Sequence, residues 1–222
     1  MPRHSRLEVL NRVLEIGLVP VFHHNDASTV CEVALACAAA GVTVFEFTNR
    51  GDHAIDAFAE LHRRTESSRR DLVLGAGSVG DAATAALYAA HGASFIVGPS
   101  FNAEVARFCN RRKLPYFPGC LTPTEISVAE EYGVEIVKLF PAVTAGPEFV
   151  RAVLGPSPWT RIMPTGMVGL DQAQVARWFD AGICAMGVGR ELIPRDAVQS
   201  ADYEAITTRA AEVLGWVRAS RK

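Results

Sequence analysis

Short apolar runs alternate with longer stretches of helical periodicity along most of this chain. Buried strands of a parallel sheet are short continuous apolar runs, whereas amphipathic helices repeat their apolar positions every three to four residues. The pattern predicts strands at residues 18–22, 43–47, 72–76, 95–97, 116–118, 136–140, 161–164 and 184–188. It predicts helices between them at residues 28–40, 53–64, 82–91, 102–112, 123–132, 148–154 and 171–180, with further helical segments at 1–17 and 203–218.

Turn residues separate these segments. Residues that commonly cap helix N-termini come before the helical patterns: Asp26, Asp52, Asp81, Asn102, Thr122 and Asp171. Glycines that suit helix C-termini come before the next strands: Gly41, Gly92, Gly133 and Gly182. Short strand–helix–strand connections require parallel pairing. We therefore expect a single domain over residues 1–222, an α/β (β/α)₈ TIM barrel with an extra N-terminal helix, and an open doubly wound sheet is the alternative.

Composition narrows the class of protein. Of the 222 residues 49% are hydrophobic, and the formal net charge is −2, so neither a nucleic-acid-binding nor a membrane-binding surface is indicated. The N-terminus lacks the apolar core of a signal peptide, and no apolar stretch reaches the ~20 residues that span a bilayer. We expect a cytoplasmic protein. The five cysteines are scattered, and the six histidines show no ligand spacing, which favours buried free thiols and no metal site.

Two strands carry charged residues on faces that should point into the barrel. Glu46 shares the face of Thr48 and Arg50 in the second strand, and Lys138 lies in the sixth strand between apolar neighbours. Active sites of such barrels lie at the C-terminal ends of the strands. Withdrawal of Lys138 from bulk water favours the neutral amine, which is the form that attacks a ketone. Each charged residue also has an interpretation that involves no catalysis. Glu46 could form a structural ion pair with Arg50, and Lys138 could extend its amine to solvent at the strand end.

Together these segments resemble the 2-keto-3-deoxy-6-phosphogluconate (KDPG) / 4-hydroxy-2-oxoglutarate (KHG) aldolase family. The likeness runs from about residue 18 to 194 and is carried by segments 17–21, 45–50, 75–79, 117–119, 137–142 and 164–166. The resemblance implies a (β/α)₈ barrel that usually forms a homotrimer. It implies a class I reaction, in which an imine on a lysine replaces any metal or organic cofactor, and a small 2-keto acid is the substrate.

The resemblance also assigns residues. Lys138, in a Lys-x-Phe-Pro motif, matches the Schiff-base lysine, Glu46 the general acid/base, and Arg50 the arginine that binds the keto-acid carboxylate. Ser78 stands where the family commonly has threonine, and a hydroxyl is kept. The other positions that match the lining of the pocket are Thr165, Phe140 and Pro99.

The chain departs from the family in the turns that follow strands seven and eight. Such turns commonly hold phosphate in barrels of this type, so we expect Gly166, Met167, Gly189 and Arg190 to bind the distal half of the substrate. Met167 replaces a glycine, and Arg190 aligns with a phosphate-binding serine. An arginine can bind phosphate or carboxylate through two parallel hydrogen bonds. The side chains of the expected phosphate site therefore differ from those of the family. The identity of the distal half of the substrate depends on these two turns.

The resemblance favours cleavage of 2-dehydro-3-deoxy-6-phosphogluconate to pyruvate and glyceraldehyde 3-phosphate. The first alternative is an aldolase for 4-hydroxy-2-oxoglutarate or an unphosphorylated keto acid. A phosphosugar isomerase or epimerase barrel is an alternative from another class of enzyme, and an inactive barrel used for binding is a third. The inward lysine and glutamate favour the aldolase over both of these.

Overall fold

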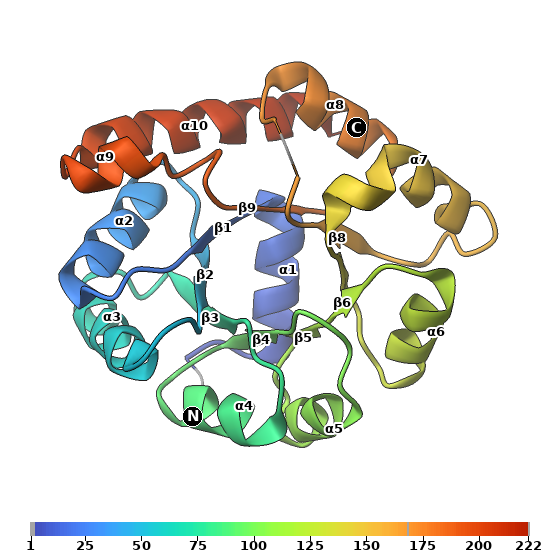
Figure 1. The fold of residues 1–222 in the computed structure, drawn as a ribbon, viewed down its shortest axis with the longest axis horizontal. Coiled ribbons are helices and arrows are strands. Elements are labelled where there is room, and N and C mark those ends of the chain that lie inside the picture. Colours follow the sequence, from blue (N-terminus) through green and yellow to red (C-terminus); the bar gives the residue numbers. More distant parts are fainter. Residues whose placement is uncertain (1–2, 168, 222) are drawn as a thin grey trace.

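The computed structural model describes residues 3–167 and 169–221, in which parallel strands alternate with helices (Figure 1). The strands are β1 (Leu18–Phe22), β2 (Val44–Thr48), β3 (Val73–Gly77), β4 (Phe95–Val97), β5 (Tyr116–Phe117), β6 (Gly119–Cys120), β7 (Val137–Leu139), β8 (Ile162–Pro164) and β9 (Met186–Val188). The helices are α1 (Arg6–Ile16), α2 (Ala27–Ala39), α3 (Ala54–Ser68), α4 (Ala82–Ala90), α5 (Ala103–Arg112), α6 (Pro123–Glu131), α7 (Ala142–Leu154), α8 (Gln172–Asp180), α9 (Arg195–Gln199) and α10 (Tyr203–Ser220).

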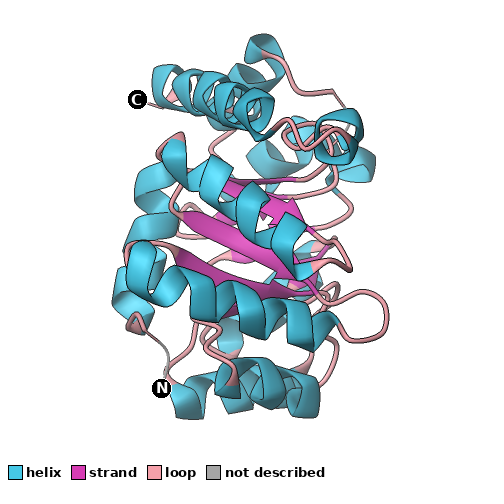
Figure 2. Ribbon diagram, turned by 90° about the vertical axis from the view of Figure 1, so that its left-hand side faces the viewer, coloured by secondary structure: helices cyan, strands magenta, loops and turns pink. Residues whose placement is uncertain are grey.

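The strands pair in parallel, as the short helical connections require. One sheet has the order β5-β4-β3-β2-β1-β9, the other has the order β6-β7-β8, and an isolated parallel bridge joins Thr165 to Gly187. The result is an α/β fold whose parallel sheet curls into a half-barrel. Helices α2 to α8 and α10 lie outside the strands (Figures 1 and 2). The predicted α/β class with parallel strands is confirmed.

Helix α1 lies across the N-terminal ends of the strands, in the middle of the view in Figure 1. Ser5 caps it and forms a capping box with Glu8. In its first turn, Arg6 forms a salt bridge of 2.7 Å with Glu135, just before β7. Further along the helix, Arg12 donates a hydrogen bond of 2.9 Å to Thr43, just before β2. Because α1 covers this end of the strands, the opposite, C-terminal end is the one available for a site.

Most of the predicted caps are confirmed. The side chains of Asp26, Asp81, Asn102, Thr122 and Asp171 each accept a backbone N–H at the start of a helix. The glycines predicted at helix ends all have positive φ. The prediction that Asp52 caps a helix is wrong. His53 occupies the N-cap of α3 with φ 60°, and it makes no capping hydrogen bond.

Most element boundaries lie within a few residues of the predicted ones, and three elements differ more substantially. The fifth strand is interrupted at Pro118, which has no N–H to give to a ladder, so it divides into β5 and β6. Helix α7 starts six residues before the predicted position, at Ala142, and is kinked at Gly146 (φ 73°, ψ 173°). The Gly146–Pro147 pair is typical of a helix break. The helical turn before it begins with the Ala142 and Val143 N–H groups, which donate to the carbonyls of Thr165 and Gly166. The short helix α9 was not predicted.

The interior is apolar and continuous. Large side chains from several strands are fully buried, among them Phe45, Phe47, Phe95, Phe117 and Ile96. All five cysteines are free thiols, as predicted; four are buried and Cys184 is half-buried. Among the described residues, no helix is both long enough and apolar enough to cross a membrane.

Candidate active site

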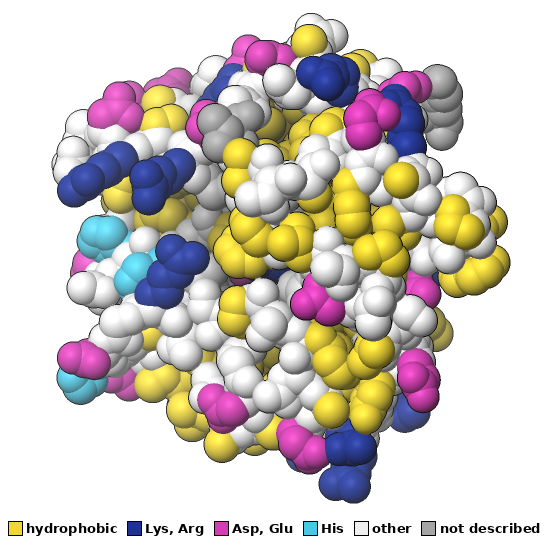
Figure 3. Space-filling view, turned by 45° about the vertical axis from the view of Figure 1, so that its right-hand side comes forward, with side chains coloured by type: hydrophobic (Ala, Val, Ile, Leu, Met, Phe, Trp, Pro, Cys, Tyr) yellow, Lys and Arg dark blue, Asp and Glu magenta, His cyan; other side chains and the backbone are white. Residues whose placement is uncertain are grey.

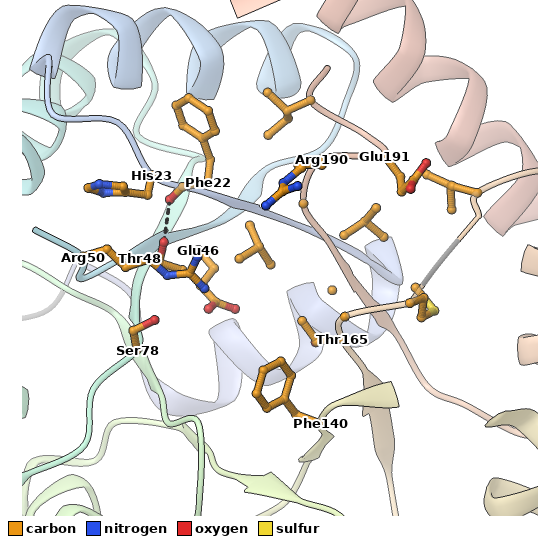
Figure 4. A pocket seen from close by; sticks show the side chains of 18 of the residues that line it. Phe22, His23, Glu46, Thr48, Arg50, Ser78, Phe140, Thr165, Arg190 and Glu191 are labelled. Atoms are coloured by element: carbon orange, nitrogen blue, oxygen red, sulfur yellow. Dashed lines mark hydrogen bonds between the residues drawn. The ribbon is translucent and has the colours of Figure 1, made fainter. Parts of the chain in front are cut away.

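A cavity of about 760 Å³ lies at the C-terminal ends of the strands. Its walls come from turns that are far apart in the sequence, after β1, β2, β3, β4, β7, β8 and β9. The structure brings all of the predicted site residues to this cavity: Glu46, Arg50, Ser78, Pro99, Lys138, Phe140, Thr165, Gly166, Met167, Gly189 and Arg190. Figure 4 shows several of them around the cavity.

Glu46 and Lys138 form a buried ion pair in this cavity. The Lys138 Nζ lies 3.7 Å from the Glu46 Oε1, and the two side chains are 7% and 0% exposed. That distance is longer than a hydrogen bond, and neither carboxylate oxygen of Glu46 has a hydrogen-bond partner among the described residues. Burial raises the pKa of Glu46, although the charges of Lys138 and Arg50 partly oppose this. A carboxyl group of this kind can take up and return a proton close to the amine.

Glycines make room for the polar side chains. A Cβ at Gly77, at the end of β3, would lie 2.0 Å from the Glu46 Oε1. A Cβ at Gly187 in β9 would lie 2.4 Å from the Thr165 Oγ1, which is buried and unpartnered within the described part of the chain. Both positions therefore require glycine, because the backbone itself forms the wall against which a polar side chain packs.

The aromatic ring of Phe140 faces the amine of Lys138. The Nζ lies 5.1 Å from the centre of this ring, within the range of a cation–π contact. Phe140 follows β7 directly, and the alternation of side chains along a strand puts it on the same face as Lys138. The amine thus lies between a carboxylate and an apolar wall, away from bulk water.

Arg50 and Ser78 lie on the wall that also carries Glu46 (Figure 4). They follow the adjacent strands β2 and β3, which pair in parallel from Val44↔Val73 to Thr48↔Gly77. Arg50 is exposed and has no ion pair with any described residue. The structural Glu46–Arg50 pair considered above is therefore absent from the described ion pairs, and Lys138 is the partner of Glu46. Ser78 has φ 58°, a conformation that is uncommon outside glycine.

The sequence did not indicate several other residues that line the cavity. They include Phe22, His23, His24, Glu191 and Arg195. The ring of His23 points away from the centre of the cavity (Figure 4). His24 accepts the Asp26 N–H at its Nδ1 (3.1 Å). The position of both histidines just after the first strand was a usable signal, because that is the active end of such a sheet.

A buried amine and a buried carboxylate that meet at the C-terminal ends of parallel strands define an α/β protein equipped for carbonyl chemistry. The family model for KDPG and KHG aldolase matches residues 9–209. The chain belongs to this family, which confirms the resemblance seen in the sequence.

Curated relatives and solved structures agree with this assignment. The chain is 33% identical to the 2-dehydro-3-deoxy-phosphogluconate aldolase of Pseudomonas aeruginosa (95% of this chain, 92% of the relative). It is 30% identical to that of Haemophilus influenzae (97% and 99%). A solved 4-hydroxy-2-oxoglutarate/2-dehydro-3-deoxyphosphogluconate aldolase from TTHB1 is 28% identical (94% and 98%), with a TM-score of 0.81. The KDPG aldolase of Legionella pneumophila, 24% identical (89% and 93%) with a TM-score of 0.78, shares the fold; its crystal structure captured pyruvate as a covalent carbinolamine.

Proposed function

We propose that this protein is a class I aldolase that cleaves 2-dehydro-3-deoxy-6-phosphogluconate to pyruvate and glyceraldehyde 3-phosphate. One observation carries the proposal: the Lys138 amine lies 3.7 Å from the buried carboxylate of Glu46. Class I cleavage needs an amine as nucleophile and a group that moves protons beside it. The names of the curated relatives, among them the P. aeruginosa enzyme, support the choice of substrate.

The proposed first half of the reaction forms an imine. Arg50 and Ser78 bind the carboxylate of the substrate, so that its C2 carbonyl faces Lys138. The neutral amine adds to C2 and gives a carbinolamine. Glu46 then donates a proton to the departing hydroxyl, which leaves as water, and a protonated imine remains on Lys138. The L. pneumophila relative, in which pyruvate was captured as a carbinolamine, offers a precedent for the first adduct.

The proposed second half breaks the carbon–carbon bond. The Glu46 carboxylate takes the proton of the C4 hydroxyl, and the C3–C4 bond pair moves into the protonated imine. An aldehyde leaves, and an enamine remains. Protonation at C3 and hydrolysis by water release pyruvate and regenerate the Lys138 amine. Electrons and protons balance with these two side chains and water alone, so the proposed reaction uses no metal and no organic cofactor.

The proposal extends to the architecture. We propose that the two sheets form one closed (β/α)₈ barrel and that residues 1–222 form one domain. Two observations support closure. The Thr165–Gly187 bridge lies between the ends of β8 and β9, and Pro118 alone separates β5 from β6 in the sequence. The helix α1 across the N-terminal ends is then the extra helix of the barrel.

A homotrimer in the cytoplasm is the proposed form of the enzyme. Hydrophobic side chains gather on the face of the molecule that carries α6 and α7 (Figure 3). Val143 is 55% exposed and Trp159 is 68% exposed, and exposed apolar groups of this kind often mark interfaces between subunits. Sedimentation of the purified protein tests this part of the proposal, and a monomer would contradict it.

The function itself is tested by product formation. The purified protein is incubated with 2-dehydro-3-deoxy-6-phosphogluconate, and pyruvate is followed with lactate dehydrogenase and NADH. We expect release of pyruvate by the native protein and none above background by Lys138→Met. 4-Hydroxy-2-oxoglutarate is the second candidate substrate, because the TTHB1 relative carries both names. If neither substrate yields pyruvate, the proposal is contradicted.

A further inference from the structure

Arg209, in helix α10, joins two turns that line the cavity. Its Nη2 donates a hydrogen bond of 2.7 Å to the carbonyl of Leu170, in the turn after β8. Its Nε donates one of 3.3 Å to the carbonyl of Glu191, in the turn after β9. Leu170 and Glu191 both line the cavity, whereas Arg209 is not among its described lining residues. One guanidinium group therefore links two walls of the site from outside the cavity.

Two further contacts fix the guanidinium group of Arg209. Its Nη1 forms an ion pair of 2.6 Å with Glu212, which lies one turn further along α10. Its Cζ lies 5.0 Å from the centre of the Trp216 ring, within the range of a cation–π contact. The side chain of Arg209 is only 26% exposed. A planar group with several fixed donors can satisfy all of these partners at once, which a single ammonium group cannot do.

Helix α10 does not depend on Arg209 for its attachment to the rest of the protein. The helix packs against α2 and α8 (Figure 1). Its buried residues are all apolar, namely Ile206, Ala210, Val213, Leu214 and Val217. Burial of apolar surface is the dominant favourable contribution to packing of this kind. We therefore expect α10 to stay in place without Arg209, so that the two hydrogen bonds act on the turns.

The turn after β8 needs a contact of this kind to hold its position. It contains Gly166 and Gly169, both with positive φ, and glycine has more accessible backbone conformations than any other residue. The Thr165–Gly187 bridge joins β8 to β9 just before the two turns begin. Beyond that bridge, the turns are linked to each other through Arg209.

We infer that Arg209 is a positioning residue, which holds the turns after β8 and β9 at the separation that fits the half of the substrate that leaves as the aldehyde. This inference rests on the proposed aldolase function. Arg209 acts through the backbone of the two turns and touches no reacting atom. Lys138 and Glu46 belong to other strands, β7 and β2, so the chemistry at the ketone does not depend on this link.

The test compares Arg209→Met and Arg209→Lys with the native protein. In Arg209→Met we expect kcat/KM for 2-dehydro-3-deoxy-6-phosphogluconate to fall about 10- to 100-fold, the size typical of a change outside a site that displaces its walls. The fall should lie in KM, with kcat little changed. Arg209→Lys keeps the charge but cannot reach both carbonyls, so its KM should rise as well. The matched control is Arg218→Met, which removes an exposed arginine of the same helix.

Pyruvate separates positioning from general damage, because it lacks the half of the substrate that the two turns are expected to bind. Trapping of pyruvate by borohydride on Lys138 should proceed equally fast in Arg209→Met and in the native protein. A native KM in either variant, or a loss of trapping equal to the loss of kcat/KM, would overturn the inference. If urea unfolding shows that Arg209→Met is not folded, Arg209→Lys decides by the same criteria. The proposed function fails on a different result, namely no trapping in the native protein.

Discussion

The Lys138 Nζ lies 3.7 Å from the Glu46 Oε1, although the two residues belong to different sheets. Glu46 lies in β2 of the larger sheet, and Lys138 lies in β7 of the smaller one. Curling of the strands brings the two faces together. The carboxylate and the amine are both withdrawn from water, where an isolated charge would be costly. Burial raises the pKa of Glu46, and the nearby charge of Lys138 partly opposes that rise.

Glu46→Gln should keep the shape of the cavity and remove the group that moves protons. We expect kcat/KM for 2-dehydro-3-deoxy-6-phosphogluconate to fall about 10²- to 10⁴-fold, the range typical of general acid–base catalysis. Lys138 stays in place, so a slow reaction with pyruvate should still give a trapped adduct. An activity within threefold of the native value would show that another group moves the proton.

The pH dependence of activity should reflect the raised pKa of Glu46. Glu46 must be ionised to take the C4 hydroxyl proton, so activity is lost as the pH falls through its pKa. Because burial raises that pKa, the acid limb of kcat/KM should lie above the ordinary value of 4.5.

Lys138 opposes the rise in the pKa of Glu46 more than Arg50 does. The pKa of Glu46, followed by carbon NMR of its carboxyl group, should therefore rise further in Lys138→Met and rise less in Arg50→Met. A lower pKa in Lys138→Met would contradict this reading of the pair.

Gly77→Ala should disturb the site through the backbone. The added methyl group would lie 2.0 Å from the Glu46 Oε1, so the carboxylate must move. We expect the free energy of unfolding to fall by about 1–3 kcal/mol, as is usual for overpacking, and kcat/KM to fall as well. Gly80→Ala is the matched control, because a Cβ there meets nothing within 4 Å. Urea unfolding and pyruvate assays measure both effects, and equal behaviour of the two variants would refute the prediction.

Arg50→Met should weaken binding of the keto-acid carboxylate. Arg50 has no ion pair with a described residue, so its loss should leave the free energy of unfolding nearly unchanged. We expect KM to rise about 10- to 100-fold, the size of a lost hydrogen bond between charged groups. Steady-state kinetics and urea unfolding test this together. A large loss of stability with an unchanged KM would assign Arg50 a structural role instead.

Local patterns were enough to predict the strands and the residues on their inward faces. The alternation of side chains placed Glu46, Thr48 and Lys138 correctly toward the cavity, because it depends only on neighbours in the chain. The same holds for caps such as Asp26 and Asp81, whose hydrogen bonds span three residues. The exception at Asp52 arose because the start of α3 uses the left-handed conformation of His53, and the sequence carries no clear signal for it.

Features that depend on contacts distant in the sequence could not be predicted in this way. The sequence left open whether Glu46 pairs with Arg50 or with Lys138, since the choice depends on how the sheets curl. The helical turn at the start of α7 is joined to the end of β8 by hydrogen bonds from the Ala142 and Val143 N–H groups to the Thr165 and Gly166 carbonyls, which are distant in the sequence. The lining position of Arg195 depends on how the segment after β9 folds back over the cavity, and no spacing in the sequence encodes that.

Covalent trapping on Lys138 is the most direct test of the proposed chemistry. The protein is incubated with pyruvate, reduced with borohydride and digested, and the peptides are examined by mass spectrometry. The account predicts a reduced pyruvate adduct on Lys138 and none in Lys138→Met. No adduct in the native protein, or an adduct that persists in Lys138→Met, would contradict it.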